Sequence, residues 1–343
     1  MKIGYLYDDT VGLYHYGPKH PMKPFRIMVT HSLVKSLGLD KKMTIIKPQV
    51  EDLTYHSRDY FNSLGETETS DCPSFEGLKD FCVKYSSASI NAARYINNKD
   101  FDIVINWAGG LHHAHLLEPS GFCYVNDIVM SILELLKVHQ RVMYIDIDVH
   151  HGDGVEDAFL LEDRVLTLSF HKFGNGFFPE TGSLITTNHK AVNVPLLSGI
   201  TDESYQYVFE PIVDECIKKF RPDVLVMQCG ADSLGADRLG MFNLSIYGHA
   251  SCIRFIKTYN LPLIILGGGG YTLCNVARCW AYETSVLCNE DIPDEIPEDN
   301  PFYSYFSPEY KFNPKFKTKF NDKNDKEYLD SISEFICERI NKY

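Results

Sequence analysis

Residues 145–154, "IDIDVHHGDG", place three aspartates and two histidines within ten positions. The apolar residues just before this segment predict a buried strand, where an unpaired charge costs several kcal/mol. Asp148 and His150 stand two residues apart, so on a strand their side chains leave the same face. These side chains therefore need a proton or a cation as a partner.

A metal ion is one such partner. Asp232 follows another predicted strand, "VLVMQ", and can reach the same point as Asp148 and His150. Two carboxylates and one imidazole leave a fourth position open, which is how catalytic zinc is held. The same ligands also accept iron(II) or cobalt(II). The alternative is a buried Asp–His hydrogen-bonded network without a metal.

Two more histidines, His112 and His113, follow a Gly-Gly turn. Asp146 and Asp153 are available to pair with them, since an aspartate that accepts from one ring nitrogen makes the other nitrogen more basic. The alternative is a pair of loop histidines, one solvated and one capping a turn. We expect His151 to face away from this chemistry and to make a structural hydrogen bond.

Glycine-rich loops supply further candidates. Residues 267–271, "GGGGY", fail the dinucleotide fingerprint because Thr272 stands where the third glycine belongs. We expect this loop to present the phenol of Tyr271, which can donate to a developing oxyanion. Phe122 and Phe178 lie in glycine-flanked loops, where two facing rings would form a slot for a slender aliphatic chain. Ordinary loop packing is the alternative for these rings.

The elements that carry these residues alternate between short strands and longer helices. The predicted strands are Ile3–Tyr7, Met43–Ile46, Asp102–Asn106, Val142–Ile147, Val165–Ser169, Val224–Gln228 and Leu263–Leu266. The predicted helices are Phe25–Leu37, Ser86–Ile96, Val125–Val138, Asp202–Phe220, Tyr247–Thr258 and Leu273–Leu287. This alternation predicts an α/β fold with a mostly parallel sheet. Four of the polar clusters follow strand ends, where ligands gather in such sheets.

Composition limits the function. The net charge is -13, with 46 acidic residues against 33 Lys plus Arg. This excess argues against direct nucleic-acid binding, which needs a basic surface, and fits a cationic partner or a merely solubilising surface. The ten cysteines form no C-x-x-C pair, and no secretory signal opens the chain, which predicts a reduced, intracellular protein. No apolar run is long enough for a membrane span, so no membrane contact is expected.

The C-terminal region changes character. Residues 289–326 are first acidic and proline-containing, then aromatic, then rich in Lys and Asn. After them, apolar residues recur at helical spacing and predict a final helix that packs back on the domain. These residues are Leu329, Ile332, Phe335, Ile336 and Ile340.

Taken together, these segments resemble the class I histone deacetylases over nearly the whole chain. The matching segments are "HYGPKHPMKPFR", "SDCPSFEGL", "GGLHHAH", "SGFCYVND", "YIDIDVHHGDGVEDAF", "SFHKFGNGFFPETG", "CGADSLGADRLGMFNLS" and "LGGGGYTLCNVARCW". The resemblance implies one deacetylase domain over 1–343, with a catalytic core of about 2–290 and a C-terminal extension of 291–343. It implies the arginase/deacetylase fold, a three-layer α/β/α arrangement around an eight-stranded, mostly parallel sheet.

The resemblance also implies hydrolysis of ε-N-acetyl-lysine in histones, and in other proteins as an alternative, to lysine and acetate. Zinc would be held by Asp148, His150 and Asp232. His113 would move the proton, with Asp153 behind it. The other catalytic residues implied by the resemblance are His112, Asp146 and Tyr271.

Other family sites carry over in the same way. The substrate arm would be bound by Asp71, Gly121, Phe122, Phe178, Leu239 and Tyr271. Arg26 would line an inner acetate pocket. Potassium would be held by Asp146, Asp148, His150, Ser169 and Phe170, with a second, looser site near Phe159 and Val165. The resemblance further implies chromatin regulation, transcriptional repression, corepressor partners and a nuclear location, with the cytoplasm as the alternative.

This sequence departs from the family at several positions. The basic pair that usually follows "HHA" is replaced by His115-Leu116, and Glu180 stands where the family commonly has glycine. The possible inositol-phosphate cleft keeps His15, Lys23 and Arg238. However, Cys274 replaces an expected arginine and Lys19 replaces a glycine. Inositol-phosphate binding therefore stays open. Two other functions remain as alternatives, namely a non-catalytic scaffold and a binuclear ureohydrolase of the same fold.

Overall fold

A single sheet of eight parallel strands organises the computed structural model, which describes residues 1–66 and 69–340. The strand order is β2-β1-β3-β8-β7-β4-β5-β6. The strands are β1 (Ile3–Leu6), β2 (Thr44–Ile46), β3 (Ile103–Asn106), β4 (Val142–Asp146), β5 (Val165–Lys172), β6 (Ala191–Leu196), β7 (Val224–Gln228) and β8 (Leu263–Leu266).

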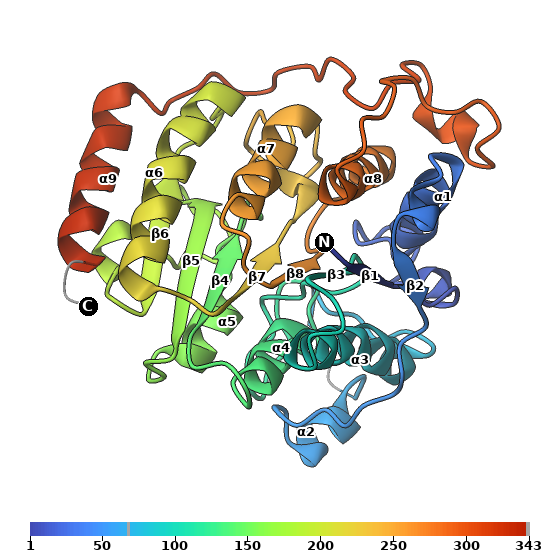
Figure 1. Cartoon of the computed structure of the whole chain (residues 1–343), viewed down its shortest axis with the longest axis horizontal. Coiled ribbons are helices and arrows are strands. Elements are labelled where there is room, and N and C mark those ends of the chain that lie inside the picture. Colours follow the sequence, from blue (N-terminus) through green and yellow to red (C-terminus); the bar gives the residue numbers. More distant parts are fainter. Residues whose placement is uncertain (67–68, 341–343) are drawn as a thin grey trace.

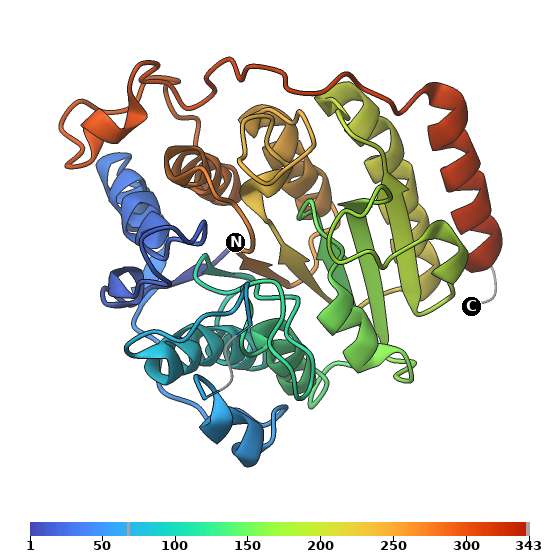
Figure 2. The ribbon, with the colours of Figure 1, turned by 180° about the vertical axis from the view of Figure 1, so that it is seen from behind.

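Helices cover both faces of this sheet. The α-helices are α1 (Phe25–Ser36), α2 (Arg58–Ser63), α3 (Leu78–Asn97), α4 (Asp127–Leu135), α5 (Asp153–Phe159), α6 (Asp202–Phe220), α7 (Ile246–Lys257), α8 (Leu273–Cys288) and α9 (Lys326–Ile340). In Figure 1, α1, α6, α7 and α8 lie on one side of the sheet and α3, α4 and α5 on the other. Figure 2 shows the same three layers from behind. The predicted three-layer α/β/α architecture is confirmed.

Alternation along the central strands explains these two covered faces. In β4, Met143 and Ile145 pack into the hydrophobic core on the α6–α8 side, while Val142 and Tyr144 pack into the core beneath α3 and α4. Because both faces are buried, the strand is apolar at consecutive positions, as is typical of parallel sheets. None of the helices that the structure describes is long and apolar enough to cross a membrane.

The sequence prediction missed three elements. The edge strand β6 contains Asn193 and Pro195, and a strand that pairs on one side only tolerates proline. The short helices α2 and α5 have only six and seven residues, too few for a visible period. Helix α3 also begins at Leu78 rather than at Ser86.

One boundary matters for the site. Strand β4 ends at Asp146, so Asp148 and His150 lie in the loop beyond it and not on the strand itself. Ile147 N–H still donates to the Gln228 carbonyl of β7 at 3.1 Å, but two later amides turn to carboxylates. Asp148 N–H donates to Asp146 Oδ1 at 3.0 Å and His150 N–H to Asp148 Oδ1 at 3.0 Å. The predicted strand, Val142–Ile147, was thus one residue too long, and the chain leaves the sheet before Asp148.

The predicted C-terminal helix is present as α9, which lies beside α6 (Figure 1). Leu329, Ile332, Ile336 and Ile340 are buried, and Phe335 is half-buried. The helix therefore covers an apolar surface of the domain, as its spacing predicted.

We expect Ile336→Ala to lower the free energy of unfolding by about 2–4 kcal/mol, because it leaves a cavity at a fully buried position. Urea unfolding followed by circular dichroism measures this loss. Glu334→Ala, on the exposed face of the same helix, is the control and should stay within about 0.5 kcal/mol of wild type. Equal stability of both variants would mean that α9 does not fold together with the rest of the chain.

Candidate active site

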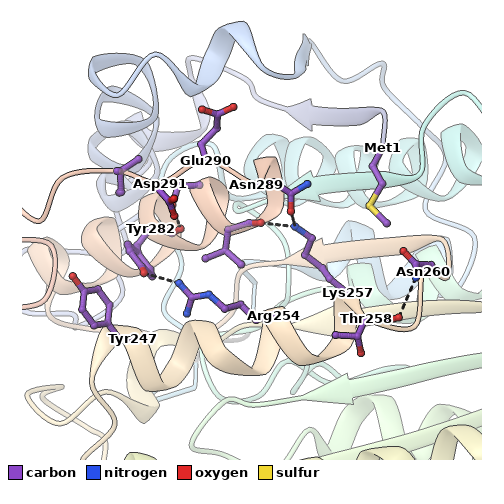
Figure 3. A pocket seen from close by; sticks show the side chains of 13 residues that line it. Met1, Tyr247, Arg254, Lys257, Thr258, Asn260, Tyr282, Asn289, Glu290 and Asp291 are labelled. Atoms are coloured by element: carbon purple, nitrogen blue, oxygen red, sulfur yellow. Dashed lines mark hydrogen bonds between the residues drawn. The ribbon is translucent and has the colours of Figure 1, made fainter.

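A pocket of about 630 Å³ lies between the C-terminal ends of α7 and α8, at the amino edge of the sheet (Figure 3). Its cations already have partners. Arg254 donates to the Tyr282 hydroxyl at 2.6 Å, and Lys257 donates to the carbonyl of Leu287 at 3.0 Å and to Asn289 Oδ1 at 2.8 Å. Ligands of open α/β sheets bind at the opposite, carboxyl edge of the strands. The active site is therefore expected at the carboxyl edge.

At the carboxyl edge, Asp148, His150 and Asp232 come together. Asp148 and His150 lie in the loop after β4, and Asp232 lies in the 3₁₀ turn Ala231–Ser233 after β7. His150 Nδ1 is 3.0 Å from Asp148 Oδ1 and 3.1 Å from Asp232 Oδ2, and one ligand atom from each residue lies within 4.8 Å of the others. All three side chains are buried. This is a compact donor set of two carboxylates and one imidazole.

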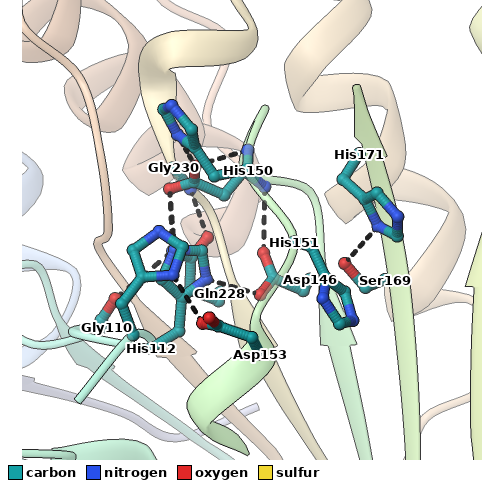
Figure 4. Close-up of polar contacts among 12 residues, drawn as sticks. Gly110, His112, Asp146, His150, His151, Asp153, Ser169, His171, Gln228 and Gly230 are labelled. Atoms are coloured by element: carbon teal, nitrogen blue, oxygen red, sulfur yellow. Dashed lines mark hydrogen bonds and ion pairs between the residues drawn. The ribbon is translucent and has the colours of Figure 1, made fainter. Parts of the chain in front are cut away.

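Backbone amides and one amide side chain orient the two carboxylates. Asp148 Oδ2 accepts from Gln228 Nε2 at 2.9 Å and from the Gly269 N–H at 2.8 Å. Asp232 Oδ1 accepts from the Val149 N–H at 3.0 Å. Figure 4 shows Gln228 and Gly230 beside His150 and the neighbouring polar groups.

Glycines at this edge make room for the carboxylates. A Cβ on Gly230 would lie 2.0 Å from Asp148 Oδ2, and one on Gly269 would lie 2.0 Å from Asp232 Oδ2. Any larger residue would push the carboxylates out of place. The "GGGGY" run is therefore needed for close approach to the acidic groups.

The carboxylates of Asp148 and Asp232 are buried so close together that a bound cation would stabilise them. Burial and the neighbouring Asp148 raise the pKa of Asp232 to about 7. Burial also raises the pKa of Asp148, but the His112 and His150 imidazoles outweigh it and hold that pKa well below its usual range. His150 Nδ1 can offer only one proton to the two carboxylates that face it. A divalent cation fits this donor set, since it would satisfy both carboxylates and the imidazole nitrogen together.

Two His–Asp couples flank the metal-type group. His112 Nδ1 lies 2.7 Å from Asp146 Oδ2, and His113 Nδ1 lies 2.7 Å from Asp153 Oδ1. The Tyr144 hydroxyl also donates to Asp146 Oδ2 at 2.7 Å. Each aspartate accepts a hydrogen bond from Nδ1 of its histidine, so Nε2 is the nitrogen left for other partners.

The two histidines differ in their electrostatic surroundings. Burial lowers the pKa of His112, but Asp146 and Asp148 outweigh it and raise the pKa to about 9. Burial and the neighbouring His112 lower the pKa of His113 to about 4. His112 thus carries a charge near neutral pH, while His113 is neutral with a free nitrogen. Such separation of paired groups is typical of acid–base sites.

A pocket of about 260 Å³ leads from the surface to these groups. The residues that line it are Asp71, His113, Gly121, Phe122, His150, Gly176, Phe177, Phe178, Leu239 and Tyr271. The ring centroids of Phe122 and Tyr271 are 5.6 Å apart and those of His113 and Phe178 are 4.9 Å apart, both pairs edge-to-face. All six residues predicted to contact substrate line this one pocket.

Sequence reasoning missed two residues here. The Phe177 ring stacks on His150 with centroids 5.1 Å apart, and the doublet "FF" in a glycine-rich loop was its only signal. Gln228, which binds Asp148, looked like the polar end of an apolar strand. Their partners lie far away in the sequence, so no local pattern could reveal them.

Comparison with known proteins identifies the family. The histone deacetylase domain model matches residues 20–287. The chain is 48% identical to histone deacetylase B of Dictyostelium discoideum, covering 99% of this chain and 86% of that protein. It is 49% identical to the probable histone deacetylase 1-A of Xenopus laevis and 48% identical to human histone deacetylase 1, each covering 99% of this chain and 75% of the relative.

The chain belongs to the histone deacetylase family. It is of the class I type, and its sheet is that of the arginase/deacetylase fold, so both predictions are confirmed. The expectation of a metal-dependent deacetylase fits the buried Asp148–His150–Asp232 group. The individual site roles carried over from the family stay predictions.

In this deacetylase, Arg26 lies behind the catalytic loop. It is buried on α1 and donates from Nη1 to the carbonyl of Gly270 at 2.7 Å and from Nη2 to that of Gly268 at 2.5 Å. Its guanidinium also lies over the Trp280 ring at 4.9 Å. Arg26 thereby fixes the loop that presents Tyr271.

The residues predicted to bind potassium lie where β4 meets β5. Asp146 and Ser169 face each other in the sheet register, and the Ser169 hydroxyl is 2.9 Å from His171 Nδ1. Phe170 follows in β5, and Phe159 and Val165 lie at the end of α5 and the start of β5. The residues of each proposed potassium site thus lie near one another, and both potassium sites stay predictions.

The residues of the possible inositol-phosphate cleft are only partly free. Lys23 Nζ donates to the carbonyls of Gly17 at 2.8 Å and Pro18 at 3.0 Å, so its ammonium already has partners. His15, Lys19 and Arg238 are exposed, and Cys274 is half-buried. Inositol-phosphate binding at this cleft stays a prediction of the family resemblance.

Among the described residues, a second group could hold a metal: His249, Cys279 and Glu283. Both nitrogens of His249 are engaged, Nε2 with the Gly230 carbonyl at 2.9 Å and Nδ1 with Glu283 Oε1 at 2.5 Å. We interpret it as a structural pair beneath the Asp232 loop. It shares no carboxylate with the first group, which disfavours the binuclear ureohydrolase.

The prediction for His151 is confirmed. Its Nδ1 is 2.8 Å from Thr181 Oγ1 and its Nε2 is 3.1 Å from Glu156 Oε2, away from the metal-type group. The imidazole is buried between these two partners, so its role is structural.

We expect Asp232→Asn to weaken zinc binding by at least about tenfold, because it removes one charged ligand from the compact donor set. Elemental analysis after gel filtration and competition with a chromophoric chelator measure this loss. Glu283→Gln, which changes the second group in the same way, should keep the metal content of wild type. The reverse pattern would assign the metal to the second group.

His115 provides a test of pH dependence. Hydrogen bonding to Asp153 and Asp157, at 3.5 and 3.0 Å, raises the pKa of His115 to about 10 from 6.5. A raised pKa stabilises the fold below the unfolded value, and this gain fades as the pH rises toward the folded value. We expect His115→Asn to lower the Tm by about 1–3 °C at pH 6, with the difference shrinking between pH 6.5 and 10. A difference that grows with pH would contradict this assignment.

Proposed function

We propose that the protein is a zinc-dependent lysine deacetylase that hydrolyses ε-N-acetyl-lysine in histones, and in other proteins as an alternative, to lysine and acetate. One observation carries this proposal: an aromatic-walled pocket of about 260 Å³ has His150, His113 and Tyr271 in its lining. A slender acyl-lysine arm suits its shape. Four methylenes at about 0.8 kcal/mol each contribute roughly 3 kcal/mol of binding in such a slot.

The chain's residues divide the chemical work. Zinc held by Asp148, His150 and Asp232 would polarise the acetyl carbonyl and lower the pKa of water. His113, neutral and oriented by Asp153, takes a proton through Nε2 and returns it to the leaving amine. His112, held at Nδ1 by Asp146, would act as an electrostatic and hydrogen-bonding partner of the negative charge that develops.

Tyr271 supplies the hydrogen bond to the acetyl oxygen. Burial and the nearby Asp232 and Asp148 raise the pKa of its phenol well above the usual value, so the hydroxyl stays protonated. A fixed donor aimed at a developing oxyanion is worth about 10²–10³ in rate. Arg26 supports this role by binding the loop carbonyls just before Tyr271.

We further propose that the chain acts as one deacetylase domain over 1–343, with a core of about 2–290 and an extension of 291–343. The single sheet and the packing of α9 on α6 support this division. Potassium near Asp146 and Ser169, corepressor partners, chromatin regulation as a repressor and a nuclear location are proposed from the family alone.

We expect purified protein to release acetate from acetyl-lysine peptides, to lose this activity with a chelator and to regain it with zinc. Tyr271→Phe should lower kcat by about 10²–10³ without changing the metal content, because only the oxyanion donor is lost. A coupled acetate assay and elemental analysis measure the two quantities.

Tyr247→Phe is the matched control. It removes the same hydroxyl from a half-exposed tyrosine that lines the pocket at the amino edge of the sheet, and its kcat should equal that of wild type. Absence of any chelator-sensitive acetate release would instead favour the scaffold function. A loss of activity in Tyr247→Phe but not in Tyr271→Phe would instead assign the active site to the pocket at the amino edge of the sheet.

A further inference from the structure

The loop 174–182 forms one wall of the active-site pocket through Gly176, Phe177 and Phe178. Several of its residues have left-handed backbone angles. The residues with positive φ are Gly174, Asn175, Gly176, Glu180 and Gly182, at 88°, 58°, 67°, 71° and 80°. Glycine and asparagine adopt this conformation readily, whereas glutamate does so only with strain.

Glu180 is therefore the one residue among these five for which a positive φ is costly. Its N–H donates to the Phe177 carbonyl at 2.9 Å, and this turn would form equally well with glycine. The backbone thus gains nothing from the glutamate side chain. Strain that is kept beside a functional site points to a role for the side chain itself.

The carboxylate of Glu180 lies close to one residue of the pocket lining. A Cβ added to Gly176, which lines the pocket, would be 3.7 Å from Glu180 Oε1. Glu180 is exposed, and within residues 1–66 and 69–340 its carboxylate makes no ion pair or side-chain hydrogen bond. It is a free negative charge beside Gly176 of the pocket lining.

Other charges near the mouth do not neutralise it. The Lys172 ammonium beneath this loop donates to the carbonyls of Phe173 at 2.5 Å and Gly174 at 3.1 Å. Asp71, on the Phe122 side, accepts from the Gly121 N–H at 2.8 Å. Arg238 is exposed and does not line the pocket itself, although the next residue, Leu239, does. Glu180 is the one charged residue of the loop 174–182, and Lys172 before it is buried, so the exposed charge on this side of the pocket is negative.

We propose that Glu180 is a specificity residue, which favours acetyl-lysine substrates that carry Lys or Arg beside the acetylated residue. This inference deepens the proposed deacetylase function and rests on it. An exposed charge pair of this kind changes kcat/KM by about 2–5-fold, mainly through KM and association, and the effect is screened by salt.

The experiment compares two acetyl-lysine peptides that differ only in flanking residues, arginine in one and glutamine in the other. The readout is the ratio of their kcat/KM values in wild type, Glu180→Gln and Glu180→Gly at low and at high salt. Glu180→Gln removes the charge and keeps the size, while Glu180→Gly also relieves the backbone. Glu338→Gln, on an exposed part of α9, is the control for net charge.

We expect the ratio to fall by about 2–5-fold in both Glu180 variants, to fall likewise in wild type at high salt, and to be unchanged in Glu338→Gln. An equal ratio in wild type and Glu180→Gln, with both folded by Tm, would overturn the proposal. Equilibrium binding of the same two peptides to zinc-loaded protein measures the preference without turnover. A preference in binding with no acetate release would refute the proposed activity and keep the role of Glu180.

Discussion

The structure depends on two negative charges that are buried side by side. Asp148 and Asp232 both have no exposed surface, and a single imidazole nitrogen lies 3.0–3.1 Å from each. In water, two such carboxylates would separate, and in an apolar interior they would take up protons. Gln228 and the amides of Val149 and Gly269 hold them together instead. The surrounding fold thus maintains a cation site in the interior, where two carboxylates would be unfavourable without the cation.

That constraint reaches outward through the backbone. Beyond Ile147 the amides of Asp148 and His150 bind carboxylates instead of a neighbouring strand. Glycines at 230 and 269 are required by the direct approach of side-chain oxygens. Behind them, His249 binds the Gly230 carbonyl at 2.9 Å and Trp280 Nε1 donates to the Cys229 carbonyl at 2.8 Å. The turn that carries Asp232 is thus held from the side opposite the pocket as well. Loss of either support would loosen a ligand that it does not touch.

The sequence predicted the central strands well, because burial on both faces makes them apolar at consecutive positions. It also predicted that Asp148, His150, Asp232 and Tyr271 would meet, since parallel strands end at one edge. Other residues of the pocket, such as Asp71 and Leu239, came only from the family resemblance. The sequence prediction extended β4 by one residue and did not show that the amides of Asp148 and His150 bind carboxylates in the loop beyond the strand. Short elements such as α5 have too few residues for a period, and the contact of Phe177 with His150 joins segments whose packing is set only in three dimensions.

The pocket itself cannot choose among acetylated proteins. Its walls contact methylenes and an acetyl group, which are the same in every acetyl-lysine, and one methylene more or less changes binding by only about 1–3 kcal/mol. Selection must therefore occur outside the slot, on residues that contact the flanking chain. Two charged residues near the pocket have partners within the chain: Asp71 binds the Gly121 amide, and the buried Lys172 binds two carbonyls. Within the part of the chain that the structure describes, Glu180 has no such partner and keeps a strained backbone conformation, so its carboxylate is available to bind a charged residue of the substrate.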